Sequence, residues 1–100
     1  MNIGATIKQL RKEKGMNQTE FGNKVDITQA TLSQIENGQT APHKTTLKRI
    51  CEVLEIPQEL LYMMSVEEDN IPKEKRELYN VAKDLMFKVF YKDEKESLEV

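Results

Sequence analysis

Two residue types that often carry catalysis or bind metals occur only once each in this chain, as Cys51 and His43. A catalytic thiol needs a base beside it, and a zinc site needs three or four ligands. No cysteine or carboxylate stands at ligand spacing from His43, and no glycine-rich phosphate loop is present. The sequence therefore predicts no enzyme, no metal and no cofactor. Cys51 is expected to be a small core residue, and a lone cysteine fits a reducing cytoplasm.

A different chemistry is available along residues 29–36. At 100° per residue, Leu32 and Ile35 mark the buried side of a helix. The opposite side carries short or uncharged polar side chains, at Gln29, Ala30, Ser33 and Gln34. Glutamine can pair bidentately with adenine, and an alanine methyl can contact the thymine methyl. We expect these four residues to read base edges; the plainer alternative, an ordinary solvent-facing polar surface, stays open at this point.

The distribution of charge supports a polyanionic partner. The net charge is −2, but residues 1–50 carry +4 and residues 51–100 carry −6. A basic half beside an acidic half is typical of a nucleic-acid-binding face next to a separate region, although chance asymmetry in a small protein gives the same picture. With 38% hydrophobic residues and no apolar run near 18 residues, the chain is expected to have one core and no membrane span. The first residues do not resemble a signal peptide.

Apolar periodicity and capping residues predict an all-α protein. Helices are expected over about 3–14, 18–25, 29–36, 44–54, a short stretch after Pro57, and 73–92. Asn17 with Glu20 forms a capping-box pattern, and Thr28 is a second N-cap. These elements predict a DNA-binding domain over 1–64, a connector over 65–72, a C-terminal amphipathic helix over 73–92 and a charged tail over 93–100.

The two helices 18–25 and 29–36 are joined by only three residues, which predicts a helix-turn-helix. The stretch MNQTEFGNKVDITQATLSQIENG, residues 16–38, resembles the Cro/CI-type helix-turn-helix of phage repressors and XRE-family regulators. The resemblance covers roughly the first sixty residues. Matching positions are Arg11, Gly15, Gln18, Thr28, Ile35, Glu36, Gly38 and Pro42.

This resemblance implies a five-helix, lambda-repressor-like domain that binds double-stranded DNA, with helix 29–36 in the major groove. It implies a transcriptional regulator, with repression expected, in a bacterium or phage. Arg11 and Glu36 would form a structural ion pair that orients the recognition helix. Contacts to DNA phosphates would come from Asn17, Gln18, Thr28, Thr31, Asn37, Gln39 and Lys44.

Three features depart from the family pattern. Asp26 and Glu55 stand where glycine is usual, at turn positions expected to need a positive φ. Gly22 replaces a usual alanine, which permits close packing. Ala30 replaces a residue that is often a polar reader, so base-specific hydrogen bonds would rest on Gln29 and Gln34.

The helix over 73–92 has an apolar stripe that the N-terminal domain does not need for its own core. We expect the stripe to be the interface of a homodimer, formed by Leu78, Val81, Ala82, Leu85, Met86, Val89 and Phe90, with Tyr79, Phe87 and Tyr91 widening it. Two alternatives stay open. The helix could fold back over the first and fifth helices of its own chain, or the acidic half could bind a partner protein, as in an antitoxin that binds a toxin and represses its own operon.

Overall fold

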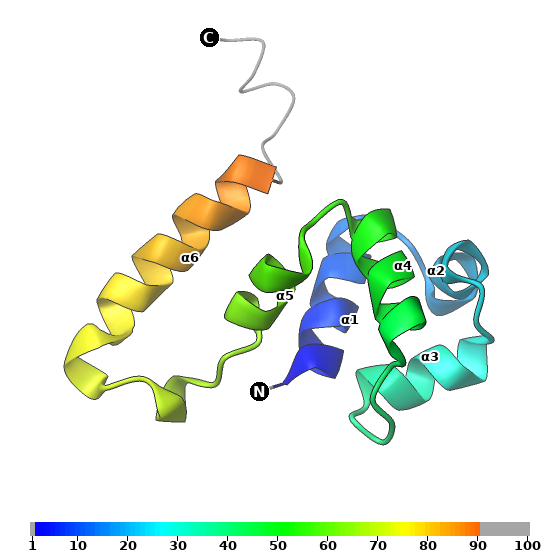
Figure 1. Ribbon diagram of the computed structural model, residues 1–100, viewed down its shortest axis with the longest axis horizontal. Helices are drawn as coiled ribbons and strands as arrows, with labels where there is room; N and C mark the ends of the chain where they lie inside the picture. Colours follow the sequence, from blue (N-terminus) through cyan, green and yellow to red (C-terminus); the bar gives the residue numbers. More distant parts are fainter. Residues whose placement is uncertain (1, 91–100) are drawn as a thin grey trace, which may run out of the picture.

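The computed structural model describes residues 2–90, which form six α-helices and two short 3-10 turns and contain no strand (Figure 1). The helices are α1 (Ile3–Glu13), α2 (Gln18–Val25), α3 (Gln29–Glu36), α4 (Lys44–Leu54), α5 (Gln58–Met64) and α6 (Arg76–Phe90). The 3-10 turns span Glu68–Asn70 and Lys73–Lys75. The fold is all-α as predicted, and α2, α3 and α4 have the expected bounds.

Side-chain caps fix where the second and third helices begin. The Asn17 side chain accepts a hydrogen bond from the Glu20 backbone N–H at 2.8 Å, and the Glu20 carboxylate accepts one from the Asn17 N–H at 3.2 Å. Both arms of the capping box are thus present. Thr28 accepts from the Thr31 N–H at 3.0 Å and caps α3 in the same way. The short turn between α2 and α3 is therefore defined at its far end by a cap.

Two non-glycine residues take left-handed backbone conformations. Asp26 has φ 62° at the end of α2, and Glu55 has φ 61° at the end of α4. These are the two positions at which the family pattern has glycine, and the positive φ expected there is present. A left-handed residue ends a helix and redirects the chain, at a cost of roughly 1–2 kcal/mol without glycine. Asp26 in this way makes the sharp turn into α3.

The core lies among α1–α5. Phe21 and Val25 of α2 meet Leu32 of α3, and all three side chains are fully buried. The remaining core residues are Ile7, Leu10, Ile35, Leu47, Ile50, Cys51, Leu54, Ile56, Leu60 and Leu61. Because α1 and α4 close the core behind α2 and α3, the outer face of α3 is left uncovered.

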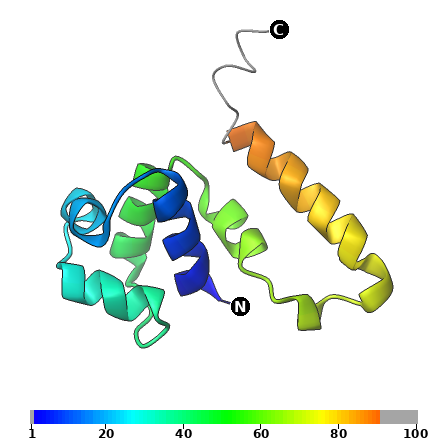
Figure 2. The ribbon, with the colours of Figure 1, turned by 180° about the vertical axis from the view of Figure 1, so that it is seen from behind.

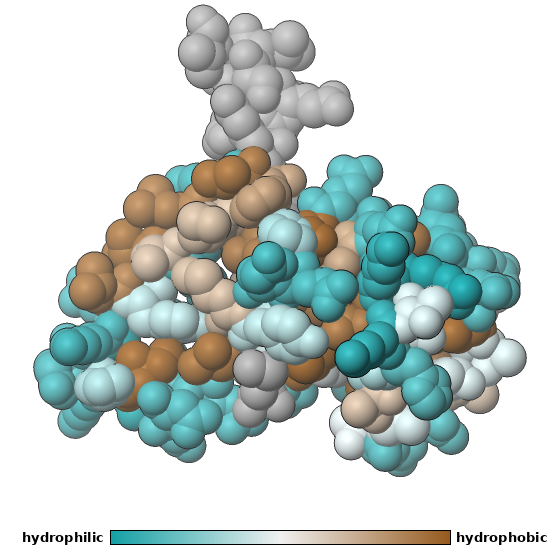
Figure 3. All heavy atoms as spheres, viewed as in Figure 1, coloured by the Kyte–Doolittle hydropathy of each residue, from teal (hydrophilic) through white to brown (hydrophobic). Residues whose placement is uncertain are grey.

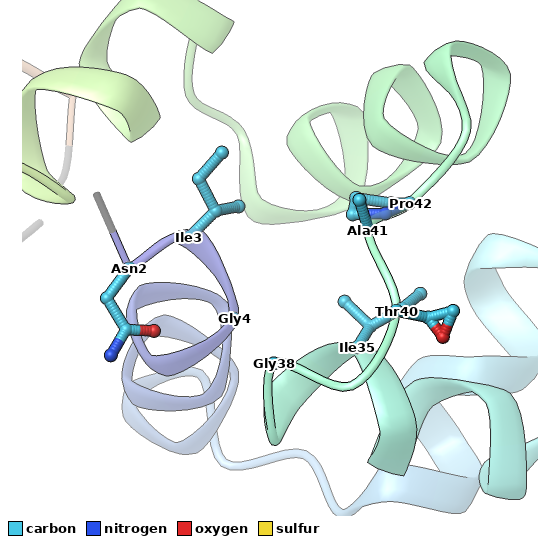
Figure 4. A pocket seen from close by; sticks show the side chains of 8 residues that line it. All are labelled: Asn2, Ile3, Gly4, Ile35, Gly38, Thr40, Ala41 and Pro42. Atoms are coloured by element: carbon cyan, nitrogen blue, oxygen red, sulfur yellow. The ribbon is translucent and has the colours of Figure 1, made fainter.

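The first helix approaches the end of α3 very closely. A Cβ atom added to Gly4 would lie only 2.2 Å from the Ile35 backbone oxygen, so no other residue fits there without a backbone shift. Beside this contact lies a hollow of about 210 Å³, shown in Figure 4 between the start of α1 and the loop after α3. Its lining consists of Asn2, Ile3, Gly4, Ile35, Gly38, Thr40, Ala41 and Pro42, and none of these carries an ionisable side chain.

The end of α5 is tied to the start of α1. The Ser65 hydroxyl lies 2.6 Å from the Leu61 carbonyl oxygen and 3.1 Å from the Thr6 hydroxyl, while the Asn2 N–H donates to the Ser65 carbonyl at 2.9 Å. Ser65 is 3% exposed. The packed structure therefore reaches Ser65, the first residue of the segment that was expected to be a connector.

The C-terminal helix differs from the expected continuous helix over 73–92. Residues Lys73–Lys75 form a 3-10 turn, in which the Lys75 N–H donates to the Pro72 carbonyl at 2.8 Å, and α6 begins at Arg76. Tyr91, Lys92 and the expected tail 93–100 lie outside the described residues. Figures 1 and 2 show α6 beside α5, at the side of the molecule away from α3. The Tyr79 hydroxyl donates to the Met63 carbonyl oxygen at this junction.

The apolar stripe of α6 is divided between two faces, which corrects the expectation of a single one. Tyr79 and Phe87, expected to widen the exposed stripe, face the domain instead, and Phe87 packs against the core. Met86 and Phe90, expected at the dimer interface, line a hollow together with Leu60 and Met63 of α5. Leu78 and Leu85 point outward and are 68% and 60% exposed. Figure 3 shows hydrophobic residues running along α6, whereas the region around α2 and α3 is hydrophilic or neutral. The helix thus folds back on its own chain and still leaves an apolar face uncovered.

Candidate nucleic-acid interface

The outer face of α3 carries the four residues expected to read bases. Gln29, Ala30 and Gln34 are exposed and Ser33 is half-buried, while Leu32 on the opposite side is fully buried. The only charged residue of this helix, Glu36, is buried. The exposed face of α3 therefore has hydrogen-bonding groups and a methyl group but no formal charge, which suits contact with the edges of base pairs.

Gln29 does not stand alone on this face. Its side-chain N–H donates to the side-chain oxygen (Oε1) of Gln18 at 2.6 Å, and the side-chain N–H of Gln18 donates to a Glu36 carboxylate oxygen at 3.0 Å. The contact leaves Gln29 with one N–H and its carbonyl oxygen, the donor and acceptor that a bidentate contact with adenine uses. Sequence spacing alone did not reveal this contact, because the two glutamines belong to different helices and are eleven residues apart.

The hydrogen bonds from Gln29 to Gln18 and from Gln18 to Glu36 end at a buried ion pair between Glu36 and Arg11. The Arg11 guanidinium donates to Glu36 through Nε at 2.7 Å and through a terminal nitrogen at 3.0 Å, and its other terminal nitrogen donates to the Met16 carbonyl at 2.7 Å. The two side chains are 6% and 1% exposed. Arg11 thereby links α1 both to the segment before α2 and to the end of α3. This network fixes the orientation of α3 relative to the rest of the domain.

The residues expected to contact phosphates lie on α3, at its two caps, and on the elements before and after it. Gln18 is half-buried, and the other six are exposed: Asn17, Thr28, Thr31, Asn37, Gln39 and Lys44. Asn17 and Thr28 also serve as helix caps. The Thr28 hydroxyl donates to the Thr31 hydroxyl oxygen at 2.9 Å, so the Thr31 proton is left to point to an outside acceptor.

The start of α4 adds backbone donors next to Lys44. Its N-cap residue, His43, makes no side-chain capping hydrogen bond. The first N–H groups of a helix have no partner within the helix, and they carry the positive end of its dipole. A phosphate near Lys44 would therefore meet both a cation and these N–H groups.

Reactive groups are scarce in the part of the chain that the structure describes. Burial, helped by the charge of Glu59, raises the pKa of the Cys51 thiol to about 11, so the thiol is protonated at neutral pH. No group of three or more metal-ligating side chains occurs within residues 2–90. No helix in that range is long and apolar enough to cross a bilayer.

Comparisons with known proteins match this architecture. The family model described as helix-turn-helix matches residues 7–60. The ImmF control region 10 kDa protein of Bacillus phage phi105 is 37% identical over 65 residues, which cover 65% of this chain and 72% of that protein. The HTH-type transcriptional regulator SinR of Bacillus subtilis (strain 168) is 42% identical over 55 residues, covering 54% of this chain and 50% of SinR.

The immunity repressor protein of Bacillus phage phi105 is 29% identical over 80 residues, covering 80% of this chain and 53% of that repressor. The chain thus spans about half the length of SinR and of the immunity repressor. No solved structure matches the chain. The family match covers more than half of the residues and includes the whole helix-turn-helix. The chain therefore belongs to the helix-turn-helix family of Cro/CI-type (XRE) transcriptional regulators.

Proposed function

We propose that this protein represses transcription by binding operator DNA with the outer face of α3 in the major groove. The observation that carries the proposal is the uncharged, exposed face of Gln29, Ala30 and Gln34 on a helix oriented by a buried network. The names of the relatives, a control-region protein, a transcriptional regulator and an immunity repressor, support it.

Base recognition would rest on two glutamines and one methyl group. Gln29 and Gln34 would each pair with adenine through the amide, and Ala30 would contact a thymine methyl. Ser33 is half-buried and would contribute a shorter contact. Arg11 and Glu36 would act only by positioning α3, since both side chains are buried away from the surface.

Phosphate contacts would hold the domain in register on the duplex. Gln18 has one amide hydrogen left after its bond to Glu36, and the Thr31 hydroxyl has its own proton left. Lys44 and the N–H groups at the start of α4 would bind a phosphate at the next position along the backbone. Asn17, Thr28, Asn37 and Gln39 complete the proposed set.

A dimer would place its two copies of α3 in major grooves that are separated by one helical turn of DNA, about 34 Å, or by a multiple of that distance. The exposed stripe of α6 is the proposed dimer interface. Because operator DNA in a bacterial cell is cytoplasmic, a cytoplasmic location forms part of the proposal. The antitoxin alternative is not favoured, since the relatives described above are named as regulators and repressors, not as partners of a toxin.

Alanine substitution on α3 tests this function. With a duplex obtained by selection from random DNA, Gln29→Ala and Gln34→Ala should each lose about 1–3 kcal/mol of binding free energy, while binding to unrelated DNA stays nearly unchanged. Gln9→Ala is the matched control, because Gln9 is an exposed glutamine on α1 whose side chain hydrogen-bonds to Glu13.

Salt dependence separates base contacts from phosphate contacts in the same assay. The parent affinity should fall steeply with salt, and Lys44→Ala should lower the slope of that dependence by about one. The two glutamine variants should keep the parent slope. If both glutamine variants retained full preference for the selected duplex, α3 would not be the reading element.

A further inference from the structure

Helix α6 has two opposite faces, and among residues 2–90 only one of them contacts the rest of the protein. Tyr79 and Phe87 face α5 and the core. At 100° per residue, Leu78, Ala82, Leu85 and Val89 point away from that side. Three of these side chains stand mostly in solvent, with 68%, 60% and 66% of Leu78, Leu85 and Val89 exposed. Packing α6 against its own domain therefore leaves an apolar stripe that no part of residues 2–90 covers.

The spacing of the stripe indicates a partner helix. Leu78, Ala82, Leu85 and Val89 follow one another at intervals of four, three and four residues, the spacing of a coiled-coil seam. A helix pairs through such a seam with another helix, and the side chains of each copy insert between those of the other. Helix α6 lies on the side of the molecule away from α3 (Figures 1 and 2), so a partner bound to α6 leaves the reading face open.

The order of residues in the stripe is symmetric about its midpoint, between Lys83 and Asp84. Reversal about that point matches Leu78 with Val89 and Ala82 with Leu85. In an antiparallel pair, each of these apolar side chains would thus lie opposite an apolar side chain of the other copy. The small Ala82 would face the large Leu85, whereas a parallel pair would set Ala82 against Ala82 and leave a void.

Charge favours the same orientation. Glu77 and Lys88 lie on one flank of the stripe, close to its two ends. A two-fold axis that relates antiparallel helices brings this flank of one copy beside the same flank of the other, so Glu77 would lie near the partner's Lys88 at both ends. In a parallel pair the flank would face the opposite one, which carries Tyr79 and Met86, and neither charge would meet an opposite charge.

We propose that two copies of this protein associate through an antiparallel α6–α6 pairing centred between Lys83 and Asp84. The proposal deepens the dimer invoked for operator binding, but the pairing itself requires no DNA. Its success or failure can therefore be measured separately from DNA recognition.

Disulfide trapping tests the orientation. In a Cys51→Ala background, Leu78→Cys and Val89→Cys are prepared as separate full-length proteins. Antiparallel pairing places the two thiols of a Leu78→Cys dimer about 16 Å apart along the helix axes, far beyond the Cβ separation of roughly 4 Å in a disulfide. Each protein alone should therefore stay uncrosslinked under mild oxidation, and an equimolar mixture should form a covalent heterodimer. Crosslinking of each protein alone, without preference for the mixture, would overturn the antiparallel arrangement.

Analytical ultracentrifugation of charge variants tests the proposed contacts between Glu77 and the Lys88 of the second copy. Lys88→Glu should raise the dimer dissociation constant about tenfold, because two attractive pairs become repulsive. Glu77→Lys combined with Lys88→Glu should restore it, and Lys73→Glu, which changes an exposed residue before α6, should leave it unchanged. If the parent protein stayed monomeric at about 100 times the concentration used in the DNA-binding assay, the proposed pairing would be wrong. DNA recognition would still stand if that monomer bound a half-site with the predicted dependence on Gln34.

Discussion

Helices α4 and α6 carry apolar stripes with nearly the same spacing, yet one is buried and the other is not. In α4, Leu47, Ile50, Cys51 and Leu54 are all less than 10% exposed. In α6, Leu78, Val81 and Leu85 are more than half exposed. The difference lies in the surroundings. Helices α1, α2 and α5 all pack against α4, whereas α6 meets α5, the 3-10 turn that precedes it and the edge of α1. Periodicity thus predicts which face of a helix is apolar, but not what will cover it.

The largest effect expected from this contrast concerns the buried network beneath the reading helix. Arg11→Ala should destabilise the protein by about 3–5 kcal/mol, because it leaves the Glu36 carboxylate buried without a counter-charge. Chemical denaturation measures the loss. Arg49→Ala is the control, since Arg49 lies 3.9 Å from an exposed Asp26 and such a surface pair contributes at most about 1 kcal/mol. Equal stability of Arg11→Ala and parent would show that the network does not hold the domain together.

A matched pair of leucine truncations tests the comparison of the two stripes itself. Leu54→Ala should cost about 2–5 kcal/mol, because it opens a cavity in the core. Leu85→Ala should change the unfolding free energy of the dilute, monomeric protein by no more than about 0.5 kcal/mol. Its effect should instead appear as a weaker dimer. Equal destabilisation by the two substitutions in the monomer would mean that the outer face of α6 is covered within its own chain.

The effect expected to be smallest at neutral pH is the titration of Cys51, the polar member of the α4 stripe. Burial raises the pKa of this thiol from 9.0 to about 11, so the folded protein keeps its proton at a pH where the unfolded chain has lost it. The contribution of this thiol to stability is complete below pH 9 and declines as the pH rises toward 11. Comparing the pH dependence of unfolding for the parent and Cys51→Ala isolates it. An identical decline in both proteins would assign the effect to other groups.

Much of the fold follows from short-range signals that the sequence displays. Asn17, Glu20 and Thr28 define the starts of α2 and α3, because capping depends on residues only three apart. Asp26 and Glu55 occupy their left-handed turns even though neither is glycine, which the family pattern made predictable. The start of α6 was less predictable, since a 3-10 turn and an α-helix differ by one hydrogen-bond register after Pro72.

The contacts that sequence reasoning did not supply join residues far apart in the chain. The Gln18–Gln29 bond depends on how two long, flexible side chains meet across a helix pair. The contact between Thr6 and Ser65 spans 59 residues and has no periodic signature. In α6, a broad apolar arc left open which side would meet the domain. In the structure that side carries Tyr79, whose hydroxyl donates to the Met63 carbonyl oxygen of α5, and Phe87, which packs against the core.

In the proposed arrangement, α3 recognises DNA and the outer face of α6 joins two copies of the protein. The most direct test is to titrate Gln34→Ala and Leu85→Glu against a single half-site and a full two-fold site. We predict that Leu85→Glu binds the half-site like the parent and loses only the additional affinity for the full site, as expected for lost bivalency. Gln34→Ala should lose about 1–3 kcal/mol already on the half-site. Weak half-site binding by Leu85→Glu, or undiminished half-site binding by Gln34→Ala, would contradict this division of roles.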